Sequence, residues 1–216
     1  MKPLICAMPL ALLAPATAWA VPANFGHPYP MPPGVLAAAA LGQFSVGEGL
    51  TTGIGGAYGV TAAQGVTFSA TRNPSGDYAL GLGAGTTFGF RGNAAKLGVS
   101  AAKTLGTAPV AGSIALDVGR PLTDRLTLYS EVATTYLPGS PGRLRYASAI
   151  EYAVTRDLAV DIEYLGGLSP AGHSDLVCGD VSLSLGRGQV TATVAVPRYP
   201  EPGSPTYSLG TSWRFL

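Results

Sequence analysis

The chain has 216 residues, of which 47% are hydrophobic and only 12% charged, and its formal net charge at pH 7 is +1. A near-neutral chain lacks the basic surface that nucleic-acid binding requires, and so few charged residues are unusual for a protein that must stay dissolved. The 30 glycines and 18 prolines leave little room for long helices.

The first 20 residues, MKPLICAMPLALLAPATAWA, have the organisation of a signal peptide. Lys2 is followed by an apolar stretch from about residue 4 to 13, and residues 18–20 provide the small-x-small sequence for cleavage before Val21. A retained membrane anchor is the alternative, but the apolar stretch falls short of the roughly 20 residues that cross a bilayer. We therefore predict a signal peptide over residues 1–20 and an exported mature chain.

Residues 21–34, VPANFGHPYPMPPG, form a proline-rich leader that we expect to be extended and without regular structure. Cys6 lies within the predicted signal peptide, so Cys178 is the only cysteine of the predicted mature chain. No internal disulfide is then possible.

From residue 35 to residue 216, apolar and polar residues alternate with a period of two over segments of about ten residues, which Gly, Pro, Asn and Asp separate. This pattern predicts an all-β domain of about twelve strands. The segments that begin at Val66, Ser113 and Val181 are shorter than the about nine to eleven residues of a full membrane crossing, so eight to ten strands are possible. The predicted strands are 36–46, 50–60, 66–71, 78–90, 97–105, 113–118, 126–136, 144–154, 158–165, 181–185, 190–196 and 206–215.

Each predicted strand has one bulky apolar face and one small or polar face. In RDLAVDIEYL, residues 156–165, Ile162 and Tyr164 share one face, and Asp161 and Glu163 share the other. A soluble β sandwich would bury the apolar face and expose abundant Lys and Glu, but here the second face carries mostly Gly, Ala, Ser and Thr. We therefore predict a closed, antiparallel, up-and-down transmembrane β-barrel whose apolar face contacts lipid.

The predicted connections differ in length between the two ends of the barrel. Starting from the first strand, every second connection is short, such as TRD at 155–157, whereas the others are longer on average, such as GGLSPAGHSDLVCG at 166–179. Short turns at one end and longer loops at the other are typical of outer-membrane barrels.

The chain resembles small outer-membrane β-barrel proteins of the Gram-negative, porin-like type, through the motifs PLTDRLTLYSEV, YAVTRDLAVDIEYL and the terminal strand TYSLGTSWRFL. The resemblance implies a location in the cell outer membrane and contact with membrane lipids. It also implies that the outer-membrane assembly machinery reads the last strand, which in this family usually ends in an aromatic residue. Here Leu216 follows Phe215, a departure of one position, and the residues of the predicted assembly signal share one face: Tyr207, Leu209, Trp213 and Phe215.

Charged residues are expected on the inner faces of the predicted strands. They are Asp117, Glu131, Arg145, Glu151, Asp161 and Glu163, on four consecutive strands, together with Lys96 and Arg214 from elsewhere. Ionisable groups inside a membrane protein are costly unless they are paired or hydrated. An acid-lined lumen that favours cations or polar solutes is one interpretation, and an internal salt-bridge network that plugs a narrow barrel is the other.

These features favour a passive pore or transport-type barrel, whose partners would include small polar or cationic solutes. A non-conducting structural or surface-interaction barrel with a salt-bridged interior is the alternative. We expect no enzyme activity, because the sequence His173-Ser174-Asp175 lies in one predicted loop, where consecutive residues cannot form a catalytic relay. No cofactor and no metal are expected, since the glycine-rich stretch 81–89 lacks the Lys-Ser/Thr ending of a phosphate loop, and the few His and Cys residues form no ligand set.

Overall fold

The computed structural model describes residues 32–46, 49–90, 93–106, 109–169, 172–199 and 203–215. The predicted signal peptide and residues 21–31 of the predicted leader lie outside these ranges, so both stay predictions. No helix in the described ranges is long and apolar enough to span a membrane.

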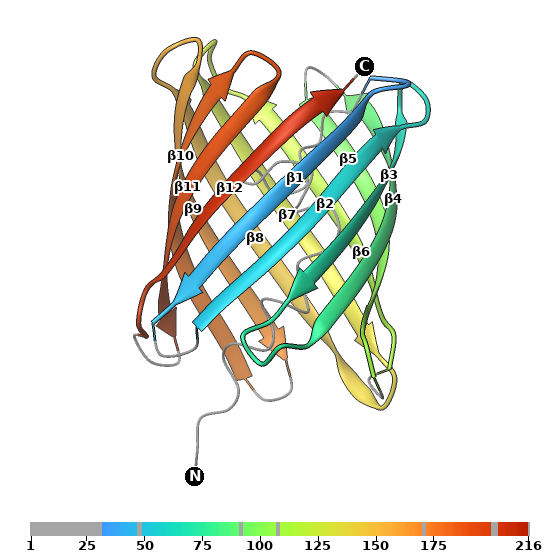
Figure 1. The fold of residues 1–216 in the computed structure, drawn as a ribbon. Helices are drawn as coiled ribbons and strands as arrows, with labels where there is room; N and C mark the ends of the chain where they lie inside the picture. The colour runs from blue at the N-terminus through green and yellow to red at the C-terminus, as the bar shows by residue number, and fades with distance from the viewer. Residues whose placement is uncertain are drawn as a thin grey trace.

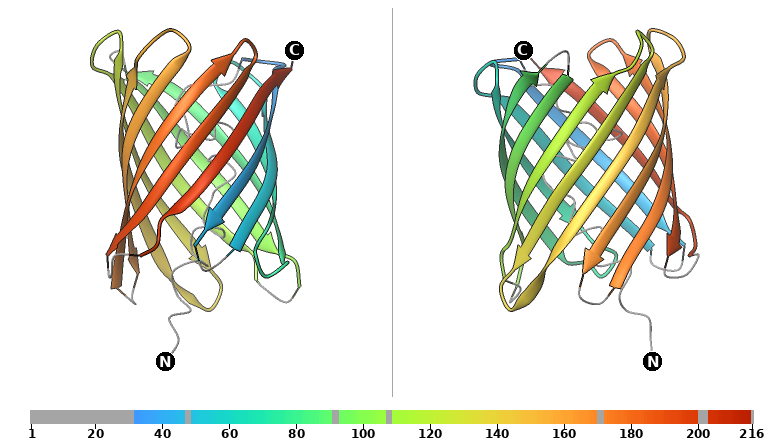
Figure 2. Two further views of the ribbon diagram at one scale, coloured as in Figure 1. Left: turned by 60° about the vertical axis from the view of Figure 1, so that its left-hand side comes forward. Right: turned by 180° about the vertical axis from the view of Figure 1, so that it is seen from behind.

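Twelve antiparallel strands form a closed barrel, which is the predicted fold class (Figure 1). Each strand pairs with the next one along the chain, and β12 pairs with β1 to complete the wall (Figure 2). Closure leaves no sheet edge unpaired. The strands are β1 (Leu36–Ser45), β2 (Gly49–Gly59), β3 (Gln64–Arg72), β4 (Tyr78–Phe90), β5 (Asn93–Thr104), β6 (Ala111–Pro121), β7 (Leu126–Leu137), β8 (Ser140–Ala153), β9 (Leu158–Ser169), β10 (Gly172–Leu185), β11 (Gly188–Tyr199) and β12 (Thr206–Phe215).

Every predicted strand is present, but several are longer than the sequence indicated. The segment predicted to begin at Val181 is part of β10, which begins at Gly172 and has 14 residues. The expected long loop at 166–179 is therefore mostly strand, and residues 138–139 alone connect β7 to β8. The predicted length difference between the two ends thus fails at these two connections. Pairing with a strand on each side satisfies the backbone there, and this overrides the loop-like composition of Gly, Ser and Pro.

The outer face of the barrel is covered by large apolar side chains. Leu82 is 69% exposed, Ile162 68% and Ile150 51%. In the described ranges, the buried apolar residues are alanines together with Tyr129 and Cys178, and no Leu, Ile, Val or Phe is among them. A soluble β sandwich requires the opposite arrangement, and exposed apolar surface of this extent is typical of a membrane interface. The apolar face therefore points outward, as the sequence predicted.

Three of the turns on the side where β1 begins and β12 ends share one hydrogen-bond pattern. In each, a threonine hydroxyl accepts hydrogen bonds from two backbone N–H groups, at 3.0 to 3.2 Å. The threonines are Thr61, Thr123 and Thr155. The hydroxyl accepts hydrogen bonds from backbone N–H groups that the tight turn would otherwise leave without a partner. The three hairpins therefore keep one geometry despite their different sequences.

Aromatic rings on the outer face cover glycines on the neighbouring strand. Gly56 pairs with Phe68, and Gly188 pairs with Trp213. A Cβ added at Gly188 would lie 3.1 Å from the Trp213 ring, and one added at Gly56 would overlap the Phe68 ring and lie 2.8 Å from the Ala37 carbonyl oxygen. Because these glycines have no side chain, the Phe68 and Trp213 rings can pack against the barrel wall at these two positions.

We expect Gly56→Ala to lower the free energy of unfolding by about 1–3 kcal/mol, the usual cost of inserting a methyl group into a filled site. Gly42→Ala is the matched control, because the space around the outer face of β1 at Gly42 is open, with nothing within 4 Å of an added Cβ. Urea unfolding of both variants in lipid vesicles measures the difference. Equal stabilities would show that the ring and the carbonyl group adjust freely.

Candidate functional site

The inner face of the barrel divides into a small, uncharged part and a charged part. Along β12 and β1 to β4 it carries mainly glycine, alanine, serine and threonine, with no acidic or basic residue until the ends of the strands. The members near mid-height include Ala39, Gly55, Ser69, Gly81, Gly83 and Gly210. Small inward side chains keep the interior of a narrow barrel from overfilling.

The charged part of the inner face extends from β5 to β10. It carries Lys96, Asp117, Glu131, Arg143, Arg145, Glu151, Asp161, Glu163 and Asp180. Among these, Asp117 and Glu131 are each 2% exposed, whereas the apolar neighbours of Asp117 on β6 point to the outside. These two carboxylates are therefore held away from both bulk water and the apolar outer surface.

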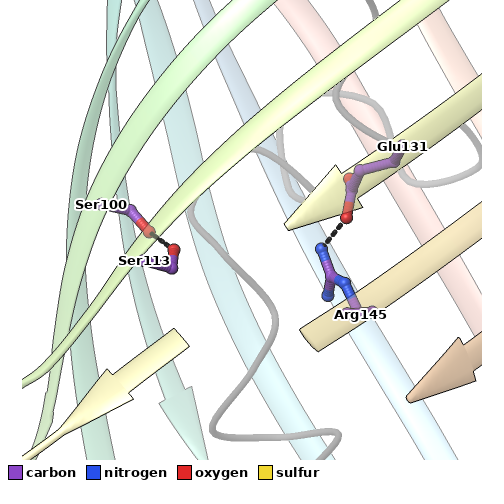
Figure 3. A network of polar contacts seen from close by, with 4 residues as sticks. All are labelled: Ser100, Ser113, Glu131 and Arg145. Carbon is purple, nitrogen blue, oxygen red and sulfur yellow. Dashed lines mark hydrogen bonds and ion pairs between the residues drawn. The ribbon is translucent and has the colours of Figure 1, made fainter. Parts of the chain in front are cut away.

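On β5 to β8, acidic and basic groups lie close together. The Arg145 guanidinium donates a hydrogen bond to the Glu131 carboxylate and forms an ion pair with it (Figure 3). Lys96 lies directly across from Asp117, which lies directly across from Glu131. Neither Asp117 oxygen makes a hydrogen bond of ordinary geometry. The salt-bridge interpretation thus applies to Glu131 and Arg145 as an ion pair, with Lys96 opposite the neighbouring acid.

On β8 to β10, by contrast, the acids neighbour one another. Glu151 pairs in register with Asp161, and Asp161 pairs with Asp180. Asp180 accepts a hydrogen bond from the Thr193 hydroxyl on β11, and the Tyr129 hydroxyl lies 3.5 Å from Glu151. Like charges directly opposite one another destabilise a sheet, so ionising all of these acids at once is costly for the fold.

Hydroxyl groups also pair across strands of the inner face. Ser100 and Ser113 lie 2.7 Å apart between β5 and β6 (Figure 3), and Ser182 and Thr191 lie 3.0 Å apart between β10 and β11. These pairs satisfy polar groups that face the interior without adding charge.

Asp180 is the interior acid that the sequence analysis missed. Its strand was predicted to begin one residue later, at Val181, although Cys178, Asp180 and Ser182 continue the alternation. Extending the predicted strand by one residue toward the N-terminus, in keeping with the period-two pattern, would have included Asp180. Arg214, in contrast, is exposed near the end of β12, opposite Ala37, and lies apart from the acids.

The remaining sequence candidates lie on strands. Tyr207, Leu209, Trp213 and Phe215 are exposed along the outer face of β12. His173 and Ser174 lie in β10 rather than in the expected loop. Consecutive strand residues point to opposite faces, so these two side chains do not converge. The His173 Nε2 atom is 3.8 Å from an Asp175 carboxylate oxygen.

Comparison with known proteins identifies the fold. No protein-family profile matches the chain, and no curated protein matches it in sequence. The KdgM porin superposes with a TM-score of 0.72 at 10% identity, over 83% of this chain and 99% of that one. The KdgM porin in complex with disordered oligogalacturonate has a TM-score of 0.70 and 11% sequence identity, over 84% of this chain and 99% of that one. An outer-membrane channel from Pseudomonas putida F1 has a TM-score of 0.63 and 11% sequence identity, over 89% of this chain and 99% of that one. The chain thus has the fold of outer-membrane porins.

Removing the basic partner of Glu131 tests the ion pair. We expect Arg145→Met to lower the free energy of unfolding by about 3–5 kcal/mol, because it leaves a buried carboxylate without its partner. The double variant Glu131→Gln/Arg145→Met should recover most of this loss. Arg143→Met, which removes an exposed arginine two residues away on the same face, is the control. Urea unfolding of the wild type, the single variants Glu131→Gln and Arg145→Met, and the double variant gives the four values of the cycle, and additive effects of the two substitutions would contradict a coupled pair.

Proposed function

We propose that the protein is a passive outer-membrane pore whose interior favours cations and polar solutes. The fold of outer-membrane porins and the apolar outer face support the location, with lipids as the surrounding medium. The observation that carries the solute preference is the group of neighbouring carboxylates on β8 to β10: Glu151, Asp161, Glu163 and Asp180. Rings and walls of carboxylates attract cations and repel anions.

The porin of similar fold that is complexed with oligogalacturonate offers a contrast. Oligogalacturonate carries a carboxylate on each sugar, so an acidic wall would repel it. On the inner face of this chain, the basic side chains on β5 to β10 are Lys96, Arg143 and Arg145, and Arg145 is paired with Glu131. We therefore infer a solute of the opposite or no charge, with the shared fold setting only the dimensions of the wall.

A non-conducting structural barrel is the second candidate. The Glu131–Arg145 ion pair and the hydroxyl pairs between strands favour it, because such contacts brace the inner wall. Neither candidate assigns a catalytic step to the chain. In both, we propose that a cleaved signal peptide exports the chain and that the outer-membrane assembly machinery reads the outward residues Tyr207, Leu209, Trp213 and Phe215.

Planar-bilayer recordings separate the two candidates. We expect the purified barrel to conduct in KCl. In a KCl gradient, the current should reverse at a potential of the sign expected for a cation-selective pore. The double variant Glu151→Gln/Asp161→Asn should shift the permeability ratio toward unity, because it removes two wall charges that attract K⁺. A folded barrel that shows no conductance would leave the structural candidate in place.

Cys178 faces the barrel interior and is buried, so a reagent can reach it only from inside the barrel, and the rate of its modification reports the potential there. Cys178 lies opposite Glu163 in register and two residues from Asp180 on the same face. In the mature chain from Val21 it is the only thiol, so we expect a cationic methanethiosulfonate reagent to modify it about tenfold faster than an anionic one of similar size, which corresponds to about 1.4 kcal/mol. Mass spectrometry measures both rates, with Cys178→Ser as the blank. Equal rates, or a faster anionic reagent, would contradict an acidic interior.

A further inference from the structure

We infer that the inner wall of β8 to β10, with the adjoining strands, forms a binding site for a linear diamine or triamine. This inference rests on the proposed pore function and names the class of solute. The site consists of one row of inward side chains that the strand register brings side by side. The row runs from β7 to β2 through Thr127, Glu151, Asp161, Asp180, Thr193, Ser208, Gln43 and Thr51.

The acidic half of this row has buried carboxylate oxygens without partners. Asp161, in the row, is 7% exposed, and Glu163, which adjoins the row two residues along β9 on the same face, is 5% exposed; one oxygen of each has no hydrogen-bond partner in the structure. A buried charged oxygen that lacks a donor costs free energy, which a bound cationic donor recovers. The two carboxylates thus offer acceptors that an ammonium group can occupy.

Described basic groups do not balance these acids. In register, the neighbours of the Asp161–Asp180 pair are Glu151 on one side and Thr193 on the other. Arg145 lies near enough to Glu163 to attract it, but its guanidinium is ion-paired with Glu131. On β8 to β10 the inward acidic groups, Glu151, Asp161, Glu163 and Asp180, thus outnumber the inward basic groups, Arg143 and Arg145, and a solute with more than one ammonium group would offset the difference.

The spread of the acids selects an elongated cation over a single metal ion. Neighbouring strands lie about 4.8 Å apart, so the row from Glu151 to Asp180 covers about 10 Å. Within the ranges that the structure describes, no three Asp, Glu, His or Cys side chains converge closely enough to hold a metal ion. Two or three ammonium groups joined by methylene segments match such a row, since each group can meet a separate carboxylate.

The other half of the row explains how a flexible solute would be held along the wall. Beyond Asp180 it continues with the hydroxyl groups of Thr193 and Ser208 and the amide of Gln43. These groups accept hydrogen bonds from ammonium without adding charge. Six strands away from β10 around the barrel, β4 carries small inward residues such as Gly81 and Gly83.

The test measures binding of spermidine to the folded, full mature chain in detergent by titration calorimetry, at constant ionic strength. We expect binding that Asp161→Asn/Asp180→Asn weakens at least about tenfold, the factor for loss of about 1.4 kcal/mol. The control Asp117→Asn/Glu131→Gln removes two buried acids from the same inner face but from another row, and should weaken binding less than about threefold by the same scale. Mg²⁺ should compete much less than putrescine.

A second measurement uses the unaltered protein, so that it does not depend on the folding of a variant. Spermidine should slow the modification of Cys178 by a cationic reagent, whereas KCl of equal ionic strength should not, because Cys178 lies beside Glu163 and adjoins the row.

Two results would overturn the inference: no binding of spermidine together with no protection of Cys178, or equal losses in the two double variants. The first would arise if protons shared among the carboxyls, rather than an amine, offset their repulsion. K⁺ conductance of the same preparation distinguishes this failure from that of the pore. A conducting barrel without spermidine binding refutes the amine site alone, and a non-conducting barrel that binds spermidine refutes the pore alone.

Discussion

The structure depends on the hydrogen-bonded closure between the first and last strands. β1 pairs with β12 from Leu36 opposite Phe215 to Ser45 opposite Thr206. In hydrocarbon no water is available to satisfy an open edge, and each unpaired backbone group would cost on the order of several kcal/mol. Closure also fixes the register of the whole wall. A slip of one residue would turn the apolar face of a strand inward, so this one seam secures the outward position of the large side chains.

Once the wall is closed, the inside and outside demand different side chains. The outside gains from bulk, and the rings of Phe68 and Trp213 even cover the glycines opposite them. The inside has limited volume, so alanine replaces the branched residues that fill the cores of soluble proteins. The same alternation therefore places the apolar residues on the outside of the barrel and the polar residues within, the opposite of a soluble protein.

Charge inside such a wall is retained at a cost, and its distribution distinguishes two roles. Between β7 and β8, Glu131 has Arg145 as its partner, which is a structural solution to burial. Between β8 and β10, the acids have one another as neighbours, and no basic residue stands opposite any of them in register. Such an arrangement is costly for folding, but a passing or bound cation would supply the positive charge that offsets the repulsion among the carboxylates. This contrast, rather than the number of acids, makes the second group the candidate site.

The sequence by itself predicted the fold class and the outward direction of the apolar face, and it indicated about twelve strands while leaving eight to ten possible, because period-two alternation is a local property of each segment. It also placed Asp161 and Glu163 on the polar face for the same reason. Only the tertiary structure decided where β10 begins and hence that Asp180 stands opposite Asp161, since pairing with β9 and β11 extends a strand through loop-like residues. It alone matched Arg145 to Glu131 and separated Arg214 from the acids. Which side chains meet is set by the stagger between strands, and no single segment encodes that stagger.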